Sequence, residues 1–358
     1  AARVNITYKI LFNDAVAMTG GQSHDGELNV PAITRQVAAE GARRIVVVTD
    51  EPEKYDDVKM LAPGTTVHHR DDLDAVQRML RDVPGLSVLV YDQTCAAEKR
   101  RRRKRGTFVD PAKRMFINHL VCEGCGDCSV KSNCISVKPI ETPLGRKRQI
   151  DQSDCNKDFS CLKGFCPSFV TVYGGKPRRL AAASTGDDFP ELPDPVLARV
   201  TGVFNILVTG IGGTGVITIG ALLGMAAHLE GRGASVLDFT GLAQKNGGVT
   251  SHVRIAEHQD MLHAVRIGVG AADLLLACDM IVAVSAGALS RVDSARTAAV
   301  VNTRVTPTSA FVRDTMIDLS STRDLKILET AVRDDAAFVD ATSLATALLG
   351  DSIASNLF

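Results

Sequence analysis

Residues 121–134 read VCEGCGDCSVKSNC, and residues 155–167 read CNKDFSCLKGFCP. Together these stretches hold seven of the nine cysteines in a chain of 358 residues. Their spacing is Cys122-x2-Cys125-x2-Cys128-x5-Cys134, followed by Cys155-x5-Cys161-x4-Cys166-Pro167. Three cysteines at consecutive x2 spacings and a later Cys-Pro pair are typical of cubane iron–sulfur ligation. We therefore predict iron–sulfur chemistry and a segment of about residues 121–175 whose fold is organised by the metal.

The spacing also predicts how the ligands divide between two clusters. In two-cluster ferredoxins the cysteine of each Cys-Pro pair ligates the other cluster. One four-iron (4Fe-4S) cluster would then take Cys122, Cys125, Cys128 and Cys166. The other would take Cys134, Cys155 and Cys161, and would lack one thiolate.

Asp158 stands where a regular motif would place the missing cysteine, so the second stretch reads Cys-x2-Asp-x2-Cys. Either Asp158 ligates the fourth iron, or the position is empty and the cluster holds three irons (3Fe-4S). The remaining reading is that Asp158 is an ordinary surface acid.

The cysteines have two alternative readings. A secreted disulfide domain could show a similar density, but the Cys-x2-Cys spacings and the expected lack of a secretory signal favour metal ligation in a reducing, cytoplasmic compartment. Cys-x2-Cys pairs also suit tetrahedral zinc, although the triple x2 spacing with Cys-Pro is more specific for iron–sulfur. Cys95 and Cys278 stand alone in apolar contexts, and we expect both to be ordinary buried side chains.

Composition excludes several classes of protein. Hydrophobic residues make up 45% and charged residues 23%, so the chain can bury ordinary cores. Lys+Arg and Asp+Glu both total 41, which gives no indication of nucleic acid binding. No apolar run approaches the roughly 18 residues of a membrane span, so we expect no membrane association. The run Lys99–Arg105 is seven consecutive cations, and we expect a solvated helix end or connector, with docking of an acidic partner as the alternative.

An α/β pattern precedes the cysteines. Val4–Phe12, Arg44–Asp50 and Leu86–Tyr91 read as strands, the second as a continuous apolar run of the kind found in parallel sheets. Pro31 opens a helix, and Asp71–Val83 has helical periodicity. Alternating strands and helices predict an α/β layer, and we expect further strands upstream because the pattern begins part-way through a fold.

A second α/β domain follows the acidic, Pro-rich stretch Ala181–Pro195. Its expected helix is Val216–Leu229, and its expected strands are Phe204–Thr209, Ser235–Phe239, Met280–Val284, Ala298–Asn302 and Ala337–Val339. We therefore divide the chain into an α/β domain (1–110), a ferredoxin-like iron–sulfur segment (111–180), a linker (181–201) and a Rossmann-like α/β domain (202–358).

The last domain opens with a glycine-rich turn. Gly210-Ile-Gly212-Gly-Thr-Gly215 satisfies G-x-G-x-x-G, and Asp238 lies near the end of the next expected strand, about where a ribose-binding acid belongs. A nicotinamide or flavin site is one reading. Close packing of helix on strand is the other.

Three stretches together resemble the fused 2-oxoacid:ferredoxin oxidoreductases, especially the indolepyruvate type. They are NITYKILFNDAVAMTGGQ (5–22), the two cysteine stretches, and GIGGTGVITIGALLGMAAHLEG (210–231) with LDFTGLAQKNGGVTSHVRI (237–255). The resemblance covers nearly the whole chain. It implies that residues 1–110 are the end of a thiamine-diphosphate-binding domain and that 202–358 are a γ-type domain, which that family does not use to bind nicotinamide.

The resemblance also assigns residues to cofactors. Asn13 and the Ala15 carbonyl would ligate the magnesium that bridges the diphosphate, as suits a hard cation. The residues packing near the cofactor would be Thr19, Gly20, Gly21 and Gln22. The family's upstream Gly-Asp-Gly motif and the domain with its activating glutamate are absent, so we expect this chain to be part of a larger catalyst.

The implied reaction is oxidative decarboxylation of a 2-oxoacid, aromatic by resemblance, to an acyl-coenzyme A with electrons passed to ferredoxin. The implied cofactors are two iron–sulfur clusters, thiamine diphosphate and Mg²⁺, with coenzyme A as co-substrate. We expect the remaining domains or subunits of the enzyme, a ferredoxin and a second copy of the chain as partners. Alternatives are a non-catalytic ferredoxin-like electron-transfer subunit and an NAD-linked iron–sulfur oxidoreductase.

Overall fold

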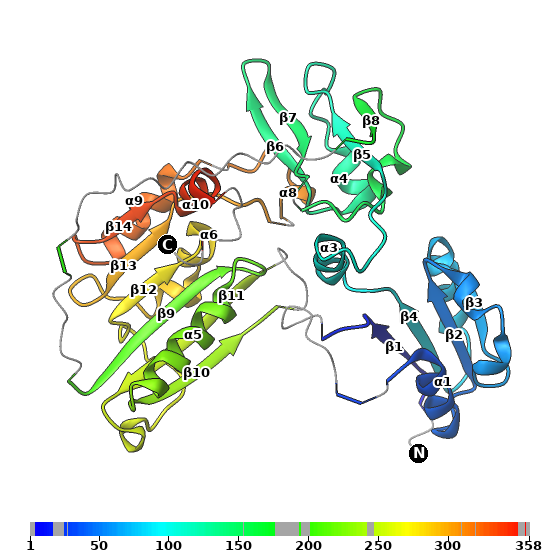
Figure 1. The fold of residues 1–358 in the computed structure, drawn as a ribbon, viewed down its shortest axis with the longest axis horizontal. Coiled ribbons are helices and arrows are strands. Elements are labelled where there is room, and N and C mark those ends of the chain that lie inside the picture. The colour runs from blue at the N-terminus through cyan, green and yellow to red at the C-terminus, as the bar shows by residue number, and fades with distance from the viewer. Residues whose placement is uncertain are drawn as a thin grey trace. The chain divides into compact units, whose positions relative to one another are not determined.

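The computed structural model describes residues 4–16, 25–26, 28–152, 154–175, 193–194, 201–241, 247–308, 310–318, 320–349 and 355. The chain divides into two compact units, Ala1–Asp110 and Pro111–Phe358 (Figure 1). No helix within the described ranges is both long enough and apolar enough to cross a membrane.

The first unit is a parallel sheet of four strands in the order β1-β4-β2-β3. Its elements are β1 (Ile6–Phe12), α1 (Val30–Ala39), β2 (Arg44–Thr49), 3-10 turns at Pro52–Tyr55, Val58–Met60 and Arg70–Asp72, β3 (Thr66–His69), α2 (Leu73–Arg81), β4 (Leu86–Asp92) and α3 (Ala96–Lys104). Because β2 is apolar at nearly every position, it can be covered on both faces. Val47 packs in the cluster that contains α1, whereas Val46 packs in the cluster that contains Leu80 of α2.

The second unit begins with a small module around the cysteines. Its elements are β5 (Lys113–Ile117), α4 (Asp127–Ser132), β6 (Val137–Thr142), β7 (Gly145–Ile150), a 3-10 turn at Ser160–Lys163 and β8 (Phe169–Tyr173). β5 pairs with β8, and β6 forms an antiparallel hairpin with β7. The core of this module is small. Ile117, Cys122 and Val137 are buried, and further cysteines pack against them.

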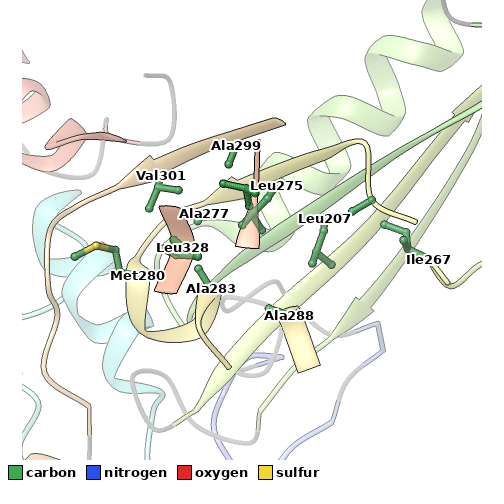
Figure 2. Close-up of a cluster of buried hydrophobic side chains, with 12 residues drawn as sticks. Leu207, Ile267, Leu275, Ala277, Met280, Ala283, Ala288, Ala299, Val301 and Leu328 are labelled. Carbon is green, nitrogen blue, oxygen red and sulfur yellow. The ribbon is translucent and has the colours of Figure 1, made fainter. Parts of the chain in front are cut away.

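A six-stranded sheet in the order β10-β11-β9-β12-β13-β14 completes the second unit. Its elements are β9 (Val203–Ile211), α5 (Val216–Leu229), β10 (Gly233–Phe239), β11 (Gly248–Ala256), a 3-10 turn at Gln259–Met261, β12 (Leu274–Ala277), α6 (Met280–Ala283), α7 (Ala286–Leu289), β13 (Ala298–Asn302), α8 (Ala310–Arg313), α9 (Thr322–Ala331), β14 (Ala337–Val339) and α10 (Ala341–Leu349). Figure 2 shows the main core, where Leu275 of β12, Met280 of α6 and Leu328 of α9 lie among small alanines.

The prediction of α/β domains is confirmed, but one expected strand is wrong. In place of a strand at residues 280–284, the chain forms the short helix α6 (Met280–Ala283). The buried Asp279 caps this helix by accepting a hydrogen bond from the Val282 amide at 2.9 Å. The strand lies just before it, at Leu274–Ala277. Strands β3 and β11 of the two larger sheets and the four strands β5 to β8 of the cysteine module also have no counterpart among the sequence predictions.

Candidate metal centre

The side chains of the cysteine loops are not arranged around a single point. No group of three or more His, Cys, Asp or Glu side chains in the described residues is placed to hold a single metal ion. The four ligands of a cubane cluster surround a group of atoms several ångströms across, in contrast to the four that share one zinc ion. The cysteines that would hold one cluster are therefore those that share one environment.

Cys122, Cys125 and Cys128 share the environment of Arg148 on β7. The pKa of the Arg148 guanidinium is lowered by burial, and the three cysteines oppose that shift. Burial raises the pKa of the Cys128 thiol, and the charge of Arg148 partly offsets the rise. These three thiols thus face one buried positive charge.

Two glycines give the first loop its shape. Gly124 and Gly126 have φ values of +76° and +86°, which favour glycine over residues with a side chain. A Cβ at Gly124 would lie 2.2 Å from the Arg146 carbonyl oxygen, so this loop can rest against β7 only without a side chain there.

Cys134, Cys155 and Cys161 form a second group with Asp158. Burial raises the pKa of Cys161 to about 12, and the negative charges of Cys134, Cys155 and Asp158 raise it further. The pKa of the Cys155 thiol is also raised, by burial and by the charges of the same neighbours, Cys134 and Asp158. The structure therefore brings together the three cysteines that the spacing leaves one ligand short and the acid at the vacant position.

Asp158 lies in a tight turn. Its neighbours Lys157 and Phe159 have φ values of 54° and 59°, a left-handed conformation that is strained for residues with a side chain. Asp158 Oδ1 accepts hydrogen bonds from the Ser160 amide at 3.3 Å and from its hydroxyl at 3.0 Å.

Backbone amides point at several of the sulfur atoms. The amides of Gly124, Ser136 and Lys157 each lie 3.4 Å from the sulfur two residues earlier, in Cys122, Cys134 and Cys155. Donors of this kind favour electron-rich sulfur, and they are one of the features that tune cluster potentials. Both groups of cysteines therefore fit iron–sulfur ligation.

Cys166 approaches the first group through strand pairing. β8 pairs with β5 so that Phe169 lies opposite Ile117, and the Asn118 amide donates to the Ser168 carbonyl at 2.8 Å. The Cys122 amide in turn donates to the Asn118 carbonyl at 3.0 Å, so the chain at Cys166 and the start of the first loop meet at Asn118.

The first unit places Asn13 and Ala15 directly after β1, at the carboxyl edge of the parallel sheet where such folds bind ligands. Thr19, Gly20, Gly21 and Gln22 lie outside the described residues. A groove of about 550 Å³ lies beside the amino-terminal half of β1 and α2, so it is away from Asn13.

Sequence reasoning missed two acids at the same edge. Asp92, which ends β4, is buried and accepts a hydrogen bond from the Tyr55 hydroxyl at 2.7 Å. Asp50, which follows β2, accepts one from Lys99 Nζ at 2.9 Å. Burial opposes ionisation of Asp50, but Lys99 outweighs it and the pKa is lowered. The sequence did place both acids at the ends of expected strands, where α/β sheets bind ligands, and this signal could have identified them.

The glycine-rich turn of the last domain is occupied by the protein's own groups. Asp279 accepts a hydrogen bond from the Ile211 amide at 2.5 Å, and the Gly212 amide donates to the Gly247 carbonyl at 3.1 Å. A Cβ at Gly210 would lie 2.9 Å from the Cys278 Cβ, so this glycine serves close packing. Strand β11 separates β9 from β10, which removes Asp238 from the neighbouring-strand position of a dinucleotide fold.

Comparison with known proteins adds a family to this geometry. Residues 205–358 match the family model described as pyruvate ferredoxin/flavodoxin oxidoreductase. These residues therefore form a domain of that family. The match supports the resemblance noted from the sequence over residues 205–358.

Two archaeal proteins are among the curated relatives of this chain. The indolepyruvate oxidoreductase subunit IorB of Methanothermobacter thermautotrophicus is 35% identical over 83 residues, 23% of this chain and 40% of that protein. The IorB subunit of Thermococcus kodakarensis is 36% identical over 73 residues, 20% of this chain and 35% of that protein. The chain thus spans well under half the length of these relatives.

Two solved structures are also similar to part of the chain. One is the pyruvate oxidoreductase subunit PORC of Thermotoga maritima, with 16% identity and a TM-score of 0.29, covering 43% of this chain and 71% of that one. The other is the γ subunit of a keto/oxoacid ferredoxin oxidoreductase of Geobacter sulfurreducens, with 19% identity, a TM-score of 0.29 and the same coverage.

Proposed function

We propose that the chain is part of an enzyme that oxidatively decarboxylates a 2-oxoacid to an acyl-coenzyme A and passes the electrons to a ferredoxin. The observation that carries the proposal is the presence, in one unit, of two separate groups of cysteines and a domain of the oxidoreductase family. The names of the archaeal relatives support an aryl substrate such as indolepyruvate. We place the enzyme in the cytoplasm, as a homo-oligomer completed by its further domains or subunits.

In this proposal Cys122, Cys125, Cys128 and Cys166 hold one four-iron cluster. The second cluster is held by Cys134, Cys155 and Cys161. Either Asp158 ligates its fourth iron through a carboxylate oxygen, or the cluster holds three irons and Asp158 lies beside the empty position. Bound clusters supply one-electron transfer, while thiamine diphosphate supplies the carbanion chemistry of decarboxylation. The work of this chain is to bind these groups and to hold backbone amides and Arg148 toward the sulfur atoms.

Asn13 and the Ala15 carbonyl would ligate the Mg²⁺ of the thiamine cofactor, with Thr19 to Gln22 packed near it. Support comes from the position of Asn13 at the carboxyl end of β1, and from the oxygen chemistry that Mg²⁺ prefers. The loop is held at both ends, since the Gln93 amide donates to the Phe12 carbonyl at 3.1 Å and the Cys95 amide to the Asn13 carbonyl at 2.9 Å.

Anaerobic assay of the full-length enzyme tests the proposal. We expect reduction of ferredoxin that depends on both a 2-oxoacid and coenzyme A, faster with indolepyruvate than with pyruvate, and lost in Cys125→Ala. Cys278→Ala is the matched control, because this cysteine lies in the last domain, away from both groups. Clusters that accept electrons from dithionite but never from a 2-oxoacid would instead make the chain a non-catalytic electron-transfer protein.

A further inference from the structure

Arg148 is the largest of the fully buried side chains in the described residues, with 1% of its surface exposed. Its Nη1 donates to the Lys147 carbonyl at 3.2 Å. Its Nε and Nη2 are buried, and no described residue accepts a hydrogen bond from either. A buried cation with unused donors is unfavourable unless something accepts from it.

The unused donors lie against the first cysteine loop. A Cβ on Gly126, between Cys125 and Cys128, would be 3.3 Å from Arg148 Nη2. The charges that act most favourably on the guanidinium are those of Cys128 and Cys122, with Cys125 also contributing. Sulfur atoms at this loop are therefore the acceptors that the geometry offers to the guanidinium.

The guanidinium also packs against the segment between β13 and α9. The ring centre of Phe311 lies 4.5 Å from Arg148 Cζ, and Phe311 is 2% exposed. Such stacking holds the planar guanidinium without supplying an acceptor in its plane. α8, which carries Phe311, contacts α4 of the cysteine module (Figure 1).

The same loop is fastened by the other arginine of β7. Arg146 Nη1 donates to the carbonyls of Thr315 at 3.2 Å and Ile317 at 2.8 Å. A Cβ on Gly126 would meet the Thr315 methyl group at 2.6 Å, so this loop packs directly on the cysteine turn. Residues of the family-matched domain thereby pack against the turn that carries the first cysteine group.

We propose that Arg148 is a positioning residue that tunes the cluster of Cys122, Cys125, Cys128 and Cys166, by donating its Nε and Nη2 hydrogen bonds to sulfur and by placing a buried positive charge beside it. This rests on the proposed function, which supplies the cluster. Reduction adds one negative charge to a cluster, so a nearby cation that water does not screen stabilises the reduced form more than the oxidised form. The first cluster should therefore have a higher reduction potential than it would have beside a neutral residue.

The test is a redox titration of the full-length enzyme followed by electron paramagnetic resonance, on wild type, Arg148→Met and Arg148→Lys. In Arg148→Met we expect the equilibrium constant for reduction of the first cluster to fall by at least about tenfold, which lowers its reduction potential by about 59 mV for one electron. The second cluster is the internal control and should move much less. Lys147→Gln is the matched variant, since it removes a cation from the next position of β7, on the other face of the strand.

Arg148→Lys keeps the positive charge but loses the planar guanidinium and its paired donors. The reduction potential of its first cluster should therefore lie between those of the wild type and Arg148→Met. If the Arg148→Met protein is isolated without the first cluster, the Arg148→Lys protein provides the test. If the first cluster of Arg148→Lys had the wild-type reduction potential and the wild-type couplings to exchangeable protons, the proposal would be overturned. A wild-type enzyme without iron would defeat the proposed function. Two loaded clusters with potentials indifferent to residue 148 would defeat this inference alone.

Discussion

Arg102 Nη1 donates a hydrogen bond to Asp14 Oδ2 at 2.5 Å, and Arg102 Nη2 donates to the Asp14 carbonyl at 3.2 Å. Asp14 follows Asn13 in the loop after β1 and has a left-handed backbone with φ 53°. Arg102 also pairs with Glu98 one turn earlier in α3. The cationic run thus fixes the loop that presents Asn13.

This relationship changes the interpretation of Lys99–Arg105. The run does end a helix, as expected, but Lys99 and Arg102 are not simply solvated. The Lys99 side chain is 13% exposed and pairs with Asp50 at 2.9 Å. Arg103 donates to the Val109 carbonyl at 3.0 Å and lies over the Phe108 ring.

Arg102→Gln should weaken retention of thiamine diphosphate several-fold, because Asp14 would lose the partner that holds its strained backbone. The unfolding free energy should fall by no more than about 1 kcal/mol, since the pair is partly exposed. Calorimetric titration of the cofactor into the full-length enzyme measures the first effect. Arg105→Gln, in the exposed cap of the same helix, is the control. Equal affinities in the two variants would mean that the Asp14 pair does not support the loop.

Asn13→Leu should abolish retention of thiamine diphosphate and leave the iron content unchanged. The leucine side chain has similar size but offers no oxygen to Mg²⁺. Asn13→Asp keeps an oxygen and should keep the cofactor. Cofactor and iron contents of the purified enzymes decide the matter, and full occupancy in Asn13→Leu would remove Asn13 from the magnesium site.

His252 of β11 predicts a pH dependence of stability. Burial lowers its pKa to about 4, and Arg266 and Arg291 add to that effect, while its Nδ1 accepts a hydrogen bond from the Ile267 amide at 3.2 Å. The unfolded chain binds a proton near pH 6.5 and the folded chain does not, so the stabilisation is present above pH 6.5 and is lost as pH falls toward 4. Between pH 7.5 and 5.5 the loss should be about 1 kcal/mol.

Urea unfolding at the two pH values checks this, with His252→Gln for comparison. The variant should lack that share of the pH dependence, because glutamine does not titrate. The same slope in both proteins would show that His252 has an ordinary pKa in the folded state.

Local chemistry explains what the sequence could predict. Val216–Leu229 and Ala298–Asn302 were predicted with the bounds that the structure has, because glycines or a continuous apolar run mark their ends. Residues 280–284 failed because a short apolar run suits a strand or a buried helix equally, and the capping role of Asp279 depends on tertiary structure.

The same division applies to the candidate site. Cysteine spacing alone predicts two ligand sets, and three cysteines of each set share an environment in the structure. The stacking of Arg148 on Phe311 joins residues 163 positions apart, and only the folded chain shows it. Strand β11 was also not predicted, and its position between β9 and β10 removes Asp238 from the place that a ribose-binding acid has in a dinucleotide fold.

Asp158 yields the sharpest prediction about the second cluster. An oxygen ligand is harder than a thiolate, so the iron beside Asp158 should be more labile than the irons held by cysteine. The oxidised enzyme should therefore show a three-iron paramagnetic resonance signal that declines on iron supplementation. Asp158→Cys should remove the signal, lock the cluster as four-iron and shift its potential.

Asp127→Ala is the matched control, because Asp127 is an exposed acid in the first cysteine motif and should leave the signal unchanged. The strained turn around Asp158 makes a simple deletion informative as well. Asp158→Ala should lose the fourth iron entirely, because alanine offers neither oxygen nor sulfur. Two stable four-iron clusters in both wild type and Asp158→Ala would show that the fourth ligand comes from another residue, and that the Asp158 carboxylate serves only its turn with Ser160.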